Sequence, residues 1–133
     1  MKIIFHISAA AIIAAATPSY SQSSQLESFY ADIWCNAHNG MLEVATKKNT
    51  RIDCLTDKYA VEADFDEKWA EGLGQSLHYS AESGKRAAVL LIIQNHNGKD
   101  RHRYVDRLRS TIDKNRLDVT VFFIETKDYE LRQ

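Results

Sequence analysis

The spacing of apolar and polar residues changes several times along the chain, and each change marks a predicted element. In three segments the apolar residues recur at three- and four-residue steps, which places them on one face of a helix. Amphipathic helices are therefore predicted at residues 26–37, 66–83 and 101–115. The second helix is expected to start at an N-cap, Asp66, and to stop at Gly84. Its predicted inward stripe consists of Trp69, Leu73, Leu77 and Ser80, with Lys68, Gln75 and Tyr79 beside it.

Strands are predicted where apolar residues alternate with polar ones or follow one another without a break. Alternation predicts a meander of three strands at residues 41–45, 51–56 and 59–65, with Ile52 and Cys54 on the same side of the second strand. Continuous apolar runs predict two strands buried on both faces, at residues 87–94 and 117–124. The order helix, three strands, helix, strand, helix, strand predicts an α/β fold with a mixed central sheet flanked by helices.

The N-terminus has the features of a cleavable secretory signal peptide. Lys2 precedes an apolar run over residues 3–16, Pro18 ends it, and small residues stand at positions 19 and 21, where a signal peptidase reads. A membrane anchor is the alternative, but the run is shorter than the ~20 residues that cross a bilayer. We expect residues 1–21 to be removed and residues 22–133 to fold as a single domain with no transmembrane segment, secreted or periplasmic. Residues 22–25 are expected to form a polar, frayed leader.

Charge is nearly balanced in total but unevenly distributed. Without residues 1–21 the domain has 16 basic and 18 acidic residues, a balance that indicates no general affinity for polyanions. Seven acids lie between residues 51 and 75, and nine bases lie between residues 85 and 116. This separation fits either a cation site beside a polyanion-binding surface or two solvated faces that attract each other. The basic run at residues 99–109 likewise fits either contact with a phosphate backbone or the wet face of a helix.

Two cysteines, Cys35 and Cys54, lie in the predicted mature domain. An even pair in an oxidising compartment favours a disulfide, which would join residues 19 positions apart. The alternative is two buried thiols that never meet, because a sequence does not give the separation of their Cα atoms. No spacing of cysteines and histidines in the chain resembles a zinc site.

Candidate chemistry is concentrated in residues 51–79. Asp53 lies on one predicted strand, and Glu62 and Asp64 share a face of the next. Carboxylates on neighbouring strands can converge on a hard cation such as Mg²⁺. A metal held by carboxylates, with a lysine such as Lys68 nearby, is the arrangement that phosphodiester hydrolysis requires. An acidic, solvated strand edge is the alternative.

This segment resembles the PD-(D/E)XK nuclease superfamily, the fold of many restriction enzymes and Holliday-junction resolvases, over about half of the chain. The resemblance implies a restriction-endonuclease-like core of helix, three strands, helix and strand, followed by an additional helix and strand. Asp53 matches the metal-binding Asp of the family, and Glu62 matches the acid of its Glu-x-Lys motif. Gln75 and Tyr79 match a Gln-x-x-x-Tyr motif on the next helix, and Glu27 matches, by spacing alone, an extra carboxylate of the first helix.

The chain departs from the family pattern at residue 64, where Asp64 stands in place of the usual lysine. Some members carry this lysine on the following helix, and Lys68 is placed for that role. The resemblance then implies a deoxyribonuclease that depends on Mg²⁺ or Mn²⁺. Its implied catalytic residues are Asp53, Glu62, Lys68, Gln75 and Tyr79, and its implied metal ligands are Asp53, Glu62 and Asp64. If Lys68 does not reach the site, the alternative is a non-catalytic exported domain that keeps the fold for binding or structure.

Overall fold

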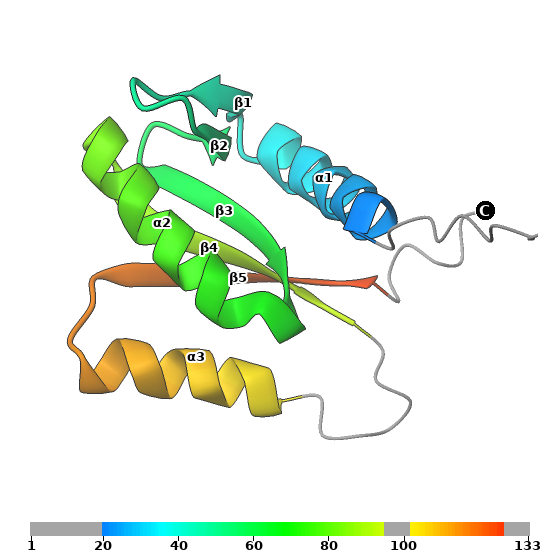
Figure 1. Ribbon diagram of the computed structural model, residues 1–133, viewed down its shortest axis with the longest axis vertical. Coiled ribbons are helices and arrows are strands. Elements are labelled where there is room, and N and C mark those ends of the chain that lie inside the picture. The colour runs from blue at the N-terminus through cyan, green and yellow to red at the C-terminus, as the bar shows by residue number, and fades with distance from the viewer. Residues whose placement is uncertain (1–19, 95–101, 127–133) are drawn as a thin grey trace, which may run out of the picture.

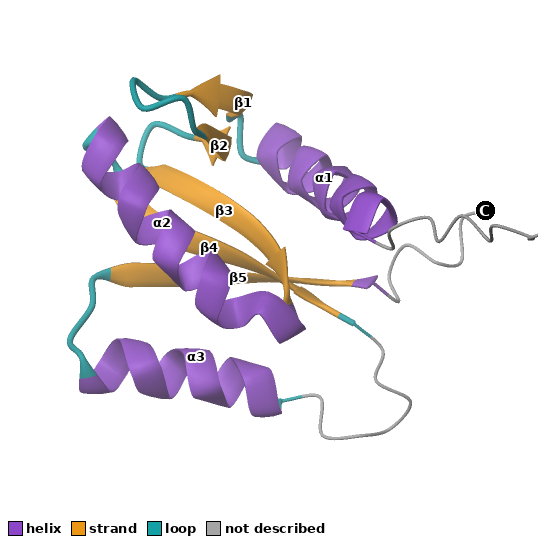
Figure 2. Cartoon of the chain, in the orientation of Figure 1, coloured by secondary structure: helices purple, strands orange, loops and turns teal. Residues whose placement is uncertain are grey.

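A computed structural model describes residues 20–94 and 102–126, with side chains described from residue 27 onward. The α/β class and the mixed, helix-flanked sheet are confirmed (Figures 1 and 2). The elements in chain order are α1 (Tyr20–Ala37), β1 (Met41–Ala45), β2 (Arg51–Leu55), β3 (Tyr59–Phe65), the 3-10 helix η1 (Asp66–Lys68), α2 (Trp69–Ser83), β4 (Arg86–Ile93), α3 (Arg103–Lys114) and β5 (Val119–Glu125). Residues 1–19 of the predicted signal peptide, and residues 99–101 of the basic run, lie outside the described residues.

The five strands form one sheet in the order β1-β2-β3-β4-β5. The pairs β1–β2 and β2–β3 are antiparallel, whereas β3–β4 and β4–β5 are parallel. The carboxyl ends of β3, β4 and β5 therefore lie at the same edge of the sheet, and η1 and the N-terminus of α3 lie near this edge (Figure 1). Across the described residues, no helix combines the length and the apolar character that a membrane span needs.

Two apolar layers enclose the sheet because β3 and β4 alternate their side chains between its faces. Val61, Ala63 and Phe65 of β3 belong to the layer beneath α1, together with Trp34 and the disulfide-bonded Cys35 of that helix. The layer beneath α2 and α3 contains Leu73, Val89, Leu91, Ile93, Val105, Leu108 and Ile112. Glu62 and Asp64 alternate with the residues of the α1 layer, so both carboxylates point to the side that α2 covers.

Two of the three predicted helix N-termini need correction. Residues 22–25 were expected to be a frayed leader, but α1 begins at Tyr20 and includes them. No proline or glycine interrupts the chain between Pro18 and Gly40, so nothing prevents the helix from extending towards its N-terminus. Asp66 was expected to be the N-cap of α2, but it begins the 3-10 helix η1, and the N-cap position of α2 is Lys68. Gly84 stops α2 as predicted, in the left-handed conformation at φ 70°.

The predicted inward stripe of α2 was also partly wrong. Leu77 is 38% exposed, whereas Gly72 and Ser76 are buried beside Leu73 and Tyr79. Small residues at 72 and 76 allow the helix to approach the sheet closely, and the larger Leu77 points away from it. Hydropathy did not reveal this contact face because glycine and serine contribute little to an apolar stripe.

One strand prediction is confirmed and another needs correction. Ile52 and Cys54 are both buried while their neighbours in β2 are not, as the alternation predicts, although Cys54 is bonded to α1 and Ile52 packs with Ala60 and Tyr79. The last strand was expected to be buried on both faces, but β5 is an edge strand and Phe123 is 41% exposed. An edge strand keeps one side open, which its apolar composition does not reveal.

Candidate active site

A cavity of about 220 Å³ opens between α1 and the strands β1, β2 and β3. Its lining residues are Glu27, Ser28, Glu43, Asp53, Glu62 and Ala63. The structure therefore brings together three of the carboxylates singled out in the sequence, one from a helix and two from neighbouring strands. Three separate elements supply them, so the cavity exists only when the fold is complete.

Asp53 reaches the cavity because β2 and β3 separate at this point. The described Cα pairs between these strands are Cys54 with Val61 and Leu55 with Ala60. Beyond them, the backbone N–H of Ala63 donates a hydrogen bond of 2.8 Å to Oδ2 of Asp53, in place of a backbone carbonyl. A side chain thus continues the ladder at the position where the strands diverge. This bond orients the carboxylate along the cavity wall.

Glu62 is the most deeply enclosed carboxyl of the cavity, with 6% of its surface exposed. Its Oε2 atom is buried and has no hydrogen-bond partner. Burial raises the pKa of Glu62 well above its usual range, and the nearby carboxylates of Asp53 and Asp64 raise it further. The pKa of Asp53 is raised by burial too, although the Ala63 N–H opposes this shift. Both shifts favour the neutral form of the carboxyl over the charged one, and the shift is larger for Glu62 than for Asp53.

Lys68 lies beside the cavity and is bonded to one of its walls. Its Nζ donates a hydrogen bond of 2.9 Å to Oε1 of Glu27, which also makes this contact an ion pair. The bond to Glu27 raises the pKa of Lys68, so the amine is a cation at neutral pH. The lysine of the helical segment and the carboxylate of α1 therefore meet, although 41 residues separate them in sequence.

Asp64 occupies a different position from the other acids. It is 4% exposed, does not line the cavity, and lies beneath α2. A Cβ atom added at Gly72 would lie 3.2 Å from both Cβ and Oδ2 of Asp64, so the helix backbone covers this carboxylate closely. Burial raises the pKa of Asp64 to about 8, and Glu27 and Glu71 add to the shift. Its Oδ2 atom is buried without a hydrogen-bond partner.

Gln75 and Tyr79 form one hydrogen-bonded pair on α2, outside the cavity lining. The Tyr79 hydroxyl donates to Oε1 of Gln75 at 3.3 Å, and Nε2 of Gln75 donates to Oε1 of Glu71 at 3.1 Å. Burial raises the pKa of Tyr79, and the negative charges of Glu62 and Asp53 raise it further. The ring packs with Ile52 of β2 and Ala60 of β3, the strands that carry these two acids. The pair therefore flanks the carboxylates from the helix side.

Glu43 is a member of the cavity that the sequence analysis missed. It lies on β1 with a left-handed φ of 53°, and Arg51 Nη1 lies 3.7 Å from its Oε2. Pairing of Leu42 with Cys54 and of Val44 with Ile52 places residue 43 beside residue 53 across the ladder. The register of the hairpin could have identified Glu43, because the turn at residues 46–50 brings residue 43 opposite residue 53.

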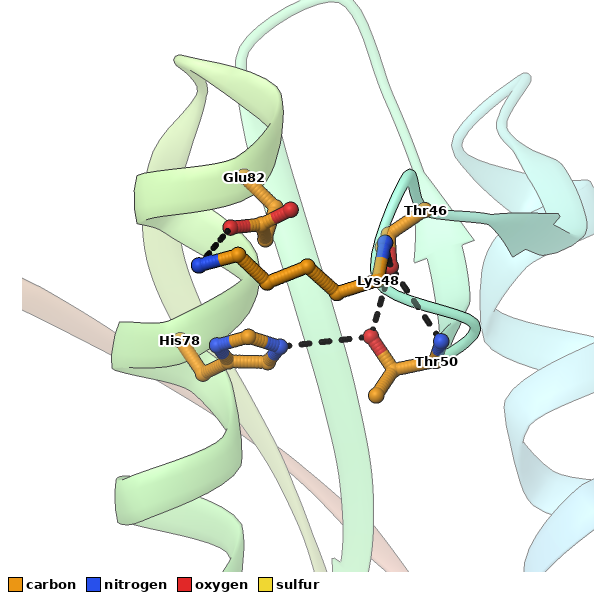
Figure 3. Close-up of polar contacts among 5 residues, drawn as sticks. All are labelled: Thr46, Lys48, Thr50, His78 and Glu82. Atoms are coloured by element: carbon orange, nitrogen blue, oxygen red, sulfur yellow. Dashed lines mark hydrogen bonds and ion pairs between the residues drawn. The ribbon is translucent and has the colours of Figure 1, made fainter.

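The β1–β2 hairpin is tied to α2 at its turn, as Figure 3 shows. His78 Nε2 lies 3.2 Å from Oγ1 of Thr50, which in turn is bonded to Oγ1 of Thr46. Lys48 Nζ forms an ion pair of 3.2 Å with Glu82, one turn further along the helix. These contacts link the hairpin that carries Glu43 and Asp53 to the helix that carries Gln75 and Tyr79.

Cys35 of α1 and Cys54 of β2 form a disulfide with a Cα–Cα distance of 5.7 Å. The bond fastens α1, which carries Glu27, to the strand that carries Asp53. Gly40 packs directly against it: a Cβ atom at residue 40 would lie 2.6 Å from Sγ of Cys35 and closer still to Sγ of Cys54.

Among the described residues, no three His, Cys, Asp or Glu side chains are arranged as they stand to hold a metal ion. No family model, curated protein or solved structure matches the chain. Function is therefore argued from the site itself.

Proposed function

We propose that the chain is an exported, metal-dependent nuclease-like protein that hydrolyses phosphodiester bonds of DNA. The observation that carries the proposal is the cavity in which Glu27, Asp53 and the buried, unpartnered Oε2 of Glu62 meet, with the Lys68 ammonium bonded to its wall. A purely structural role does not explain buried carboxyls that lack partners, because each costs stability. Functional sites keep such groups because a ligand satisfies them.

The arrangement of the elements supports the finer fold assignment that the resemblance implies. An antiparallel meander is followed by a strand parallel to β3, with α1 and α2 on opposite faces of the sheet. This is the order of a restriction-endonuclease-like core, and α3 and β5 extend it. In that framework Asp53 and Glu62 lie on the strands where the superfamily carries its acids.

The donor chemistry fits Mg²⁺ or Mn²⁺, because carboxylates line the cavity and one buried oxygen among them, Oε2 of Glu62, has no hydrogen-bond partner. Of the three expected ligands, Asp53 and Glu62 line the cavity and would hold the ion there, whereas Asp64 lies under α2. A bound divalent ion would neutralise phosphate charge and lower the pKa of a water molecule. Because burial raises the pKa of Asp53 and of Glu62, binding of the ion would release any proton that these carboxyls hold.

Lys68, Gln75 and Tyr79 are proposed to act without giving or taking a proton in the reaction. Lys68 is held by Glu27 as a cation beside the cavity, where it would stabilise the charge that develops on the phosphoryl oxygens and orient the attacking water. Tyr79 donates to Gln75 and so fixes the amide of that side chain. We assign both residues to orientation of the site or the substrate.

Specific observations also favour the second candidate, a non-catalytic exported domain that keeps this fold for binding or structure. Asp64 stands where the superfamily usually has its lysine and lies under α2 rather than in the cavity. The described residues also contain no ready-made group of three metal ligands. A protein of this kind would retain the cavity and bind without cutting.

Cleavage of linear and circular DNA by the purified protein, in Mg²⁺, in Mn²⁺ and in EDTA, separates the two candidates. We expect cutting that depends on the metal and falls by about 100-fold or more in Glu62→Gln and in Lys68→Met. Asp57→Asn and Lys47→Met make the same charge changes at exposed turn residues and should cut normally. If no metal supports cutting, or if Glu62→Gln cuts as well as the parent, the nuclease proposal is wrong.

Export is tested separately, because it concerns the N-terminus and not the cavity. The protein should be recovered outside the cytoplasm of the producing cell, and N-terminal sequencing should place its first residue near residue 22. Retention of Met1 in the recovered protein would contradict cleavage.

A further inference from the structure

Three exposed arginines lie on the helix α3. Elsewhere in the described chain, Lys48, Arg51, Lys68 and Arg86 each form an ion pair with a carboxylate. Arg103, Arg107 and Arg109 are exposed, and within the described residues none of them is paired with an acid. Asp106 lies on the same helix but forms no ion pair with any of these arginines among the described residues. This helix therefore presents cationic groups whose charge no carboxylate of the described chain neutralises.

Each of the three guanidiniums lies over an aromatic ring. The Cζ atoms of Arg103 and Arg107 lie 4.5 and 5.8 Å from the centre of the Tyr104 ring, and Arg103 also donates a hydrogen bond to the Tyr104 hydroxyl. Arg109 lies 5.2 Å from the centre of the Phe123 ring on β5. Phe123 is exposed and Tyr104 is half-buried. Accessible rings with cations beside them are what non-specific single-strand binders use, because bases stack on the rings while the cations contact phosphates.

The position of this surface relative to the cavity supports the same ligand. α3 contacts η1, the segment that ends in Lys68. Both elements follow strands whose carboxyl ends lie at one edge of the sheet (Figure 1). A strand of nucleic acid with one phosphate near Lys68 would therefore have neighbouring phosphates within reach of α3.

We propose that α3 is a docking surface for the backbone of single-stranded nucleic acid, with Arg103, Arg107 and Arg109 on phosphates and Tyr104 and Phe123 stacking on bases. The inference rests on the proposed nuclease function, because it takes the ligand of the cavity to be nucleic acid. It adds to that function a binding surface that is separate from the residues that would cut.

Binding is measured by fluorescence anisotropy with a labelled oligothymidine of about 20 nucleotides, longer than typical site sizes of up to ~16. EDTA is present, so that cleavage and binding are read separately. The triple variant Arg103→Gln/Arg107→Gln/Arg109→Gln should bind at least about ten-fold more weakly, and its salt dependence should fall in slope by about 2, given ~0.7 per phosphate contact. Tyr104→Ala should weaken binding about five-fold or more.

The matched control is Lys48→Gln/Lys58→Gln/Arg86→Gln, which removes three charges from other parts of the molecule and should leave binding unchanged. Circular dichroism establishes that each variant is folded. Loss of affinity confined to the α3 variants supports the docking surface even if no cutting is ever seen, which distinguishes it from the nuclease proposal. Equal affinity of parent and triple variant overturns it, as does binding to anionic phospholipid vesicles without binding to the oligonucleotide.

Discussion

Asp64 and Glu62 are carboxyls held in surroundings that oppose their charge. Both lie on the α2 side of β3, and each has a buried oxygen without a hydrogen-bond partner. Neighbouring acids do not stabilise the charged forms, because each further negative charge raises the pKa of the others. At the residue scale, the site is therefore stable as a neutral cluster and gains from a cation.

The stability of the metal-free protein is expected to fall as pH rises. The pKa of Asp64 is about 8 in the folded protein, against ~3.9 for an unperturbed aspartate. Above pH ~4 the unfolded chain loses this proton while the folded protein keeps it, so stability decreases from about pH 4 to about pH 8 and is fully reduced above that.

Urea unfolding in EDTA across this pH range measures the effect, with Asp64→Asn as the comparison. The variant should be the more stable protein at pH 8, and its stability should depend less steeply on pH. Identical pH profiles for the two proteins would show that Asp64 ionises normally.

Two glycines of α2 provide a matched pair of substitutions. A methyl group at Gly72 would meet Cβ and Oδ2 of Asp64 at 3.2 Å, whereas nothing lies within 4 Å at Gly74. Gly72→Ala should therefore destabilise the protein by about 1–3 kcal/mol. Gly74→Ala should stabilise it by about 0.5–1 kcal/mol through helix propensity. Chemical denaturation of both variants checks the difference, and equal effects would contradict the close approach of α2 to Asp64.

At the scale of elements, the hairpin of β1 and β2 depends on contacts at both of its ends. Its turn is held to α2 through Thr50 and His78, and its other end is held to α1 through the disulfide at Cys54. Glu43 and Asp53 lie between these two attachments. The positions of Glu43 and Asp53 therefore depend on both attachments of the hairpin.

The contact of His78 with Thr50 should contribute measurably to stability. We expect His78→Ala and Thr50→Val each to cost about 1 kcal/mol, and the double variant to cost little more than either, because both remove the same interaction. Lys48→Met should cost less than ~1 kcal/mol, since the Lys48 side chain is 71% exposed in its pair with Glu82. Thermal or urea unfolding of the four variants tests this, and additive costs would mean that the contact is not formed.

Alternation and apolar runs were sufficient to predict which segments are strands and helices. The strands at 41–45 and 59–65 agree with β1 and β3 in both bounds. Where predictions failed, tertiary packing decides the outcome: α2 turns Gly72 and Ser76 rather than Leu77 towards the sheet, and β5 lies at the edge of the sheet. Such contacts depend on residues distant in sequence.

In the candidate site, too, local sequence patterns predicted some residues, and tertiary contacts decided the others. Glu27, Asp53 and Glu62 could be named from their spacing and from the resemblance, and the structure places all three around one cavity. Asp64 was expected among them, but the close packing of Gly72 places it under α2. Glu43 was missed because an exposed acid on a short strand gives no signal until the hairpin register is known.

At the scale of the whole molecule, the disulfide cross-links α1 to β2 of the sheet, in addition to the backbone that joins α1 to β1. It joins residues 19 apart in the sequence, and closure of a loop of this length is worth about 3 kcal/mol in the chain-entropy model. Cys35→Ala/Cys54→Ala should lower the free energy of unfolding by roughly that amount. Dithiothreitol should lower the stability of the parent in the same way and leave the double variant unchanged, and a parent insensitive to reduction would contradict this.

The packing of Gly40 on the disulfide has a consequence for how these positions can change in evolution. Any side chain at residue 40 would overlap the two sulfur atoms, so the oxidised protein accepts only glycine there. Once both cysteines are replaced by alanine, that overlap is gone and Gly40→Ala should be tolerated. Residue 40 and the two cysteines are therefore expected to be inherited as a unit, with loss of the bond coming before any substitution of the glycine.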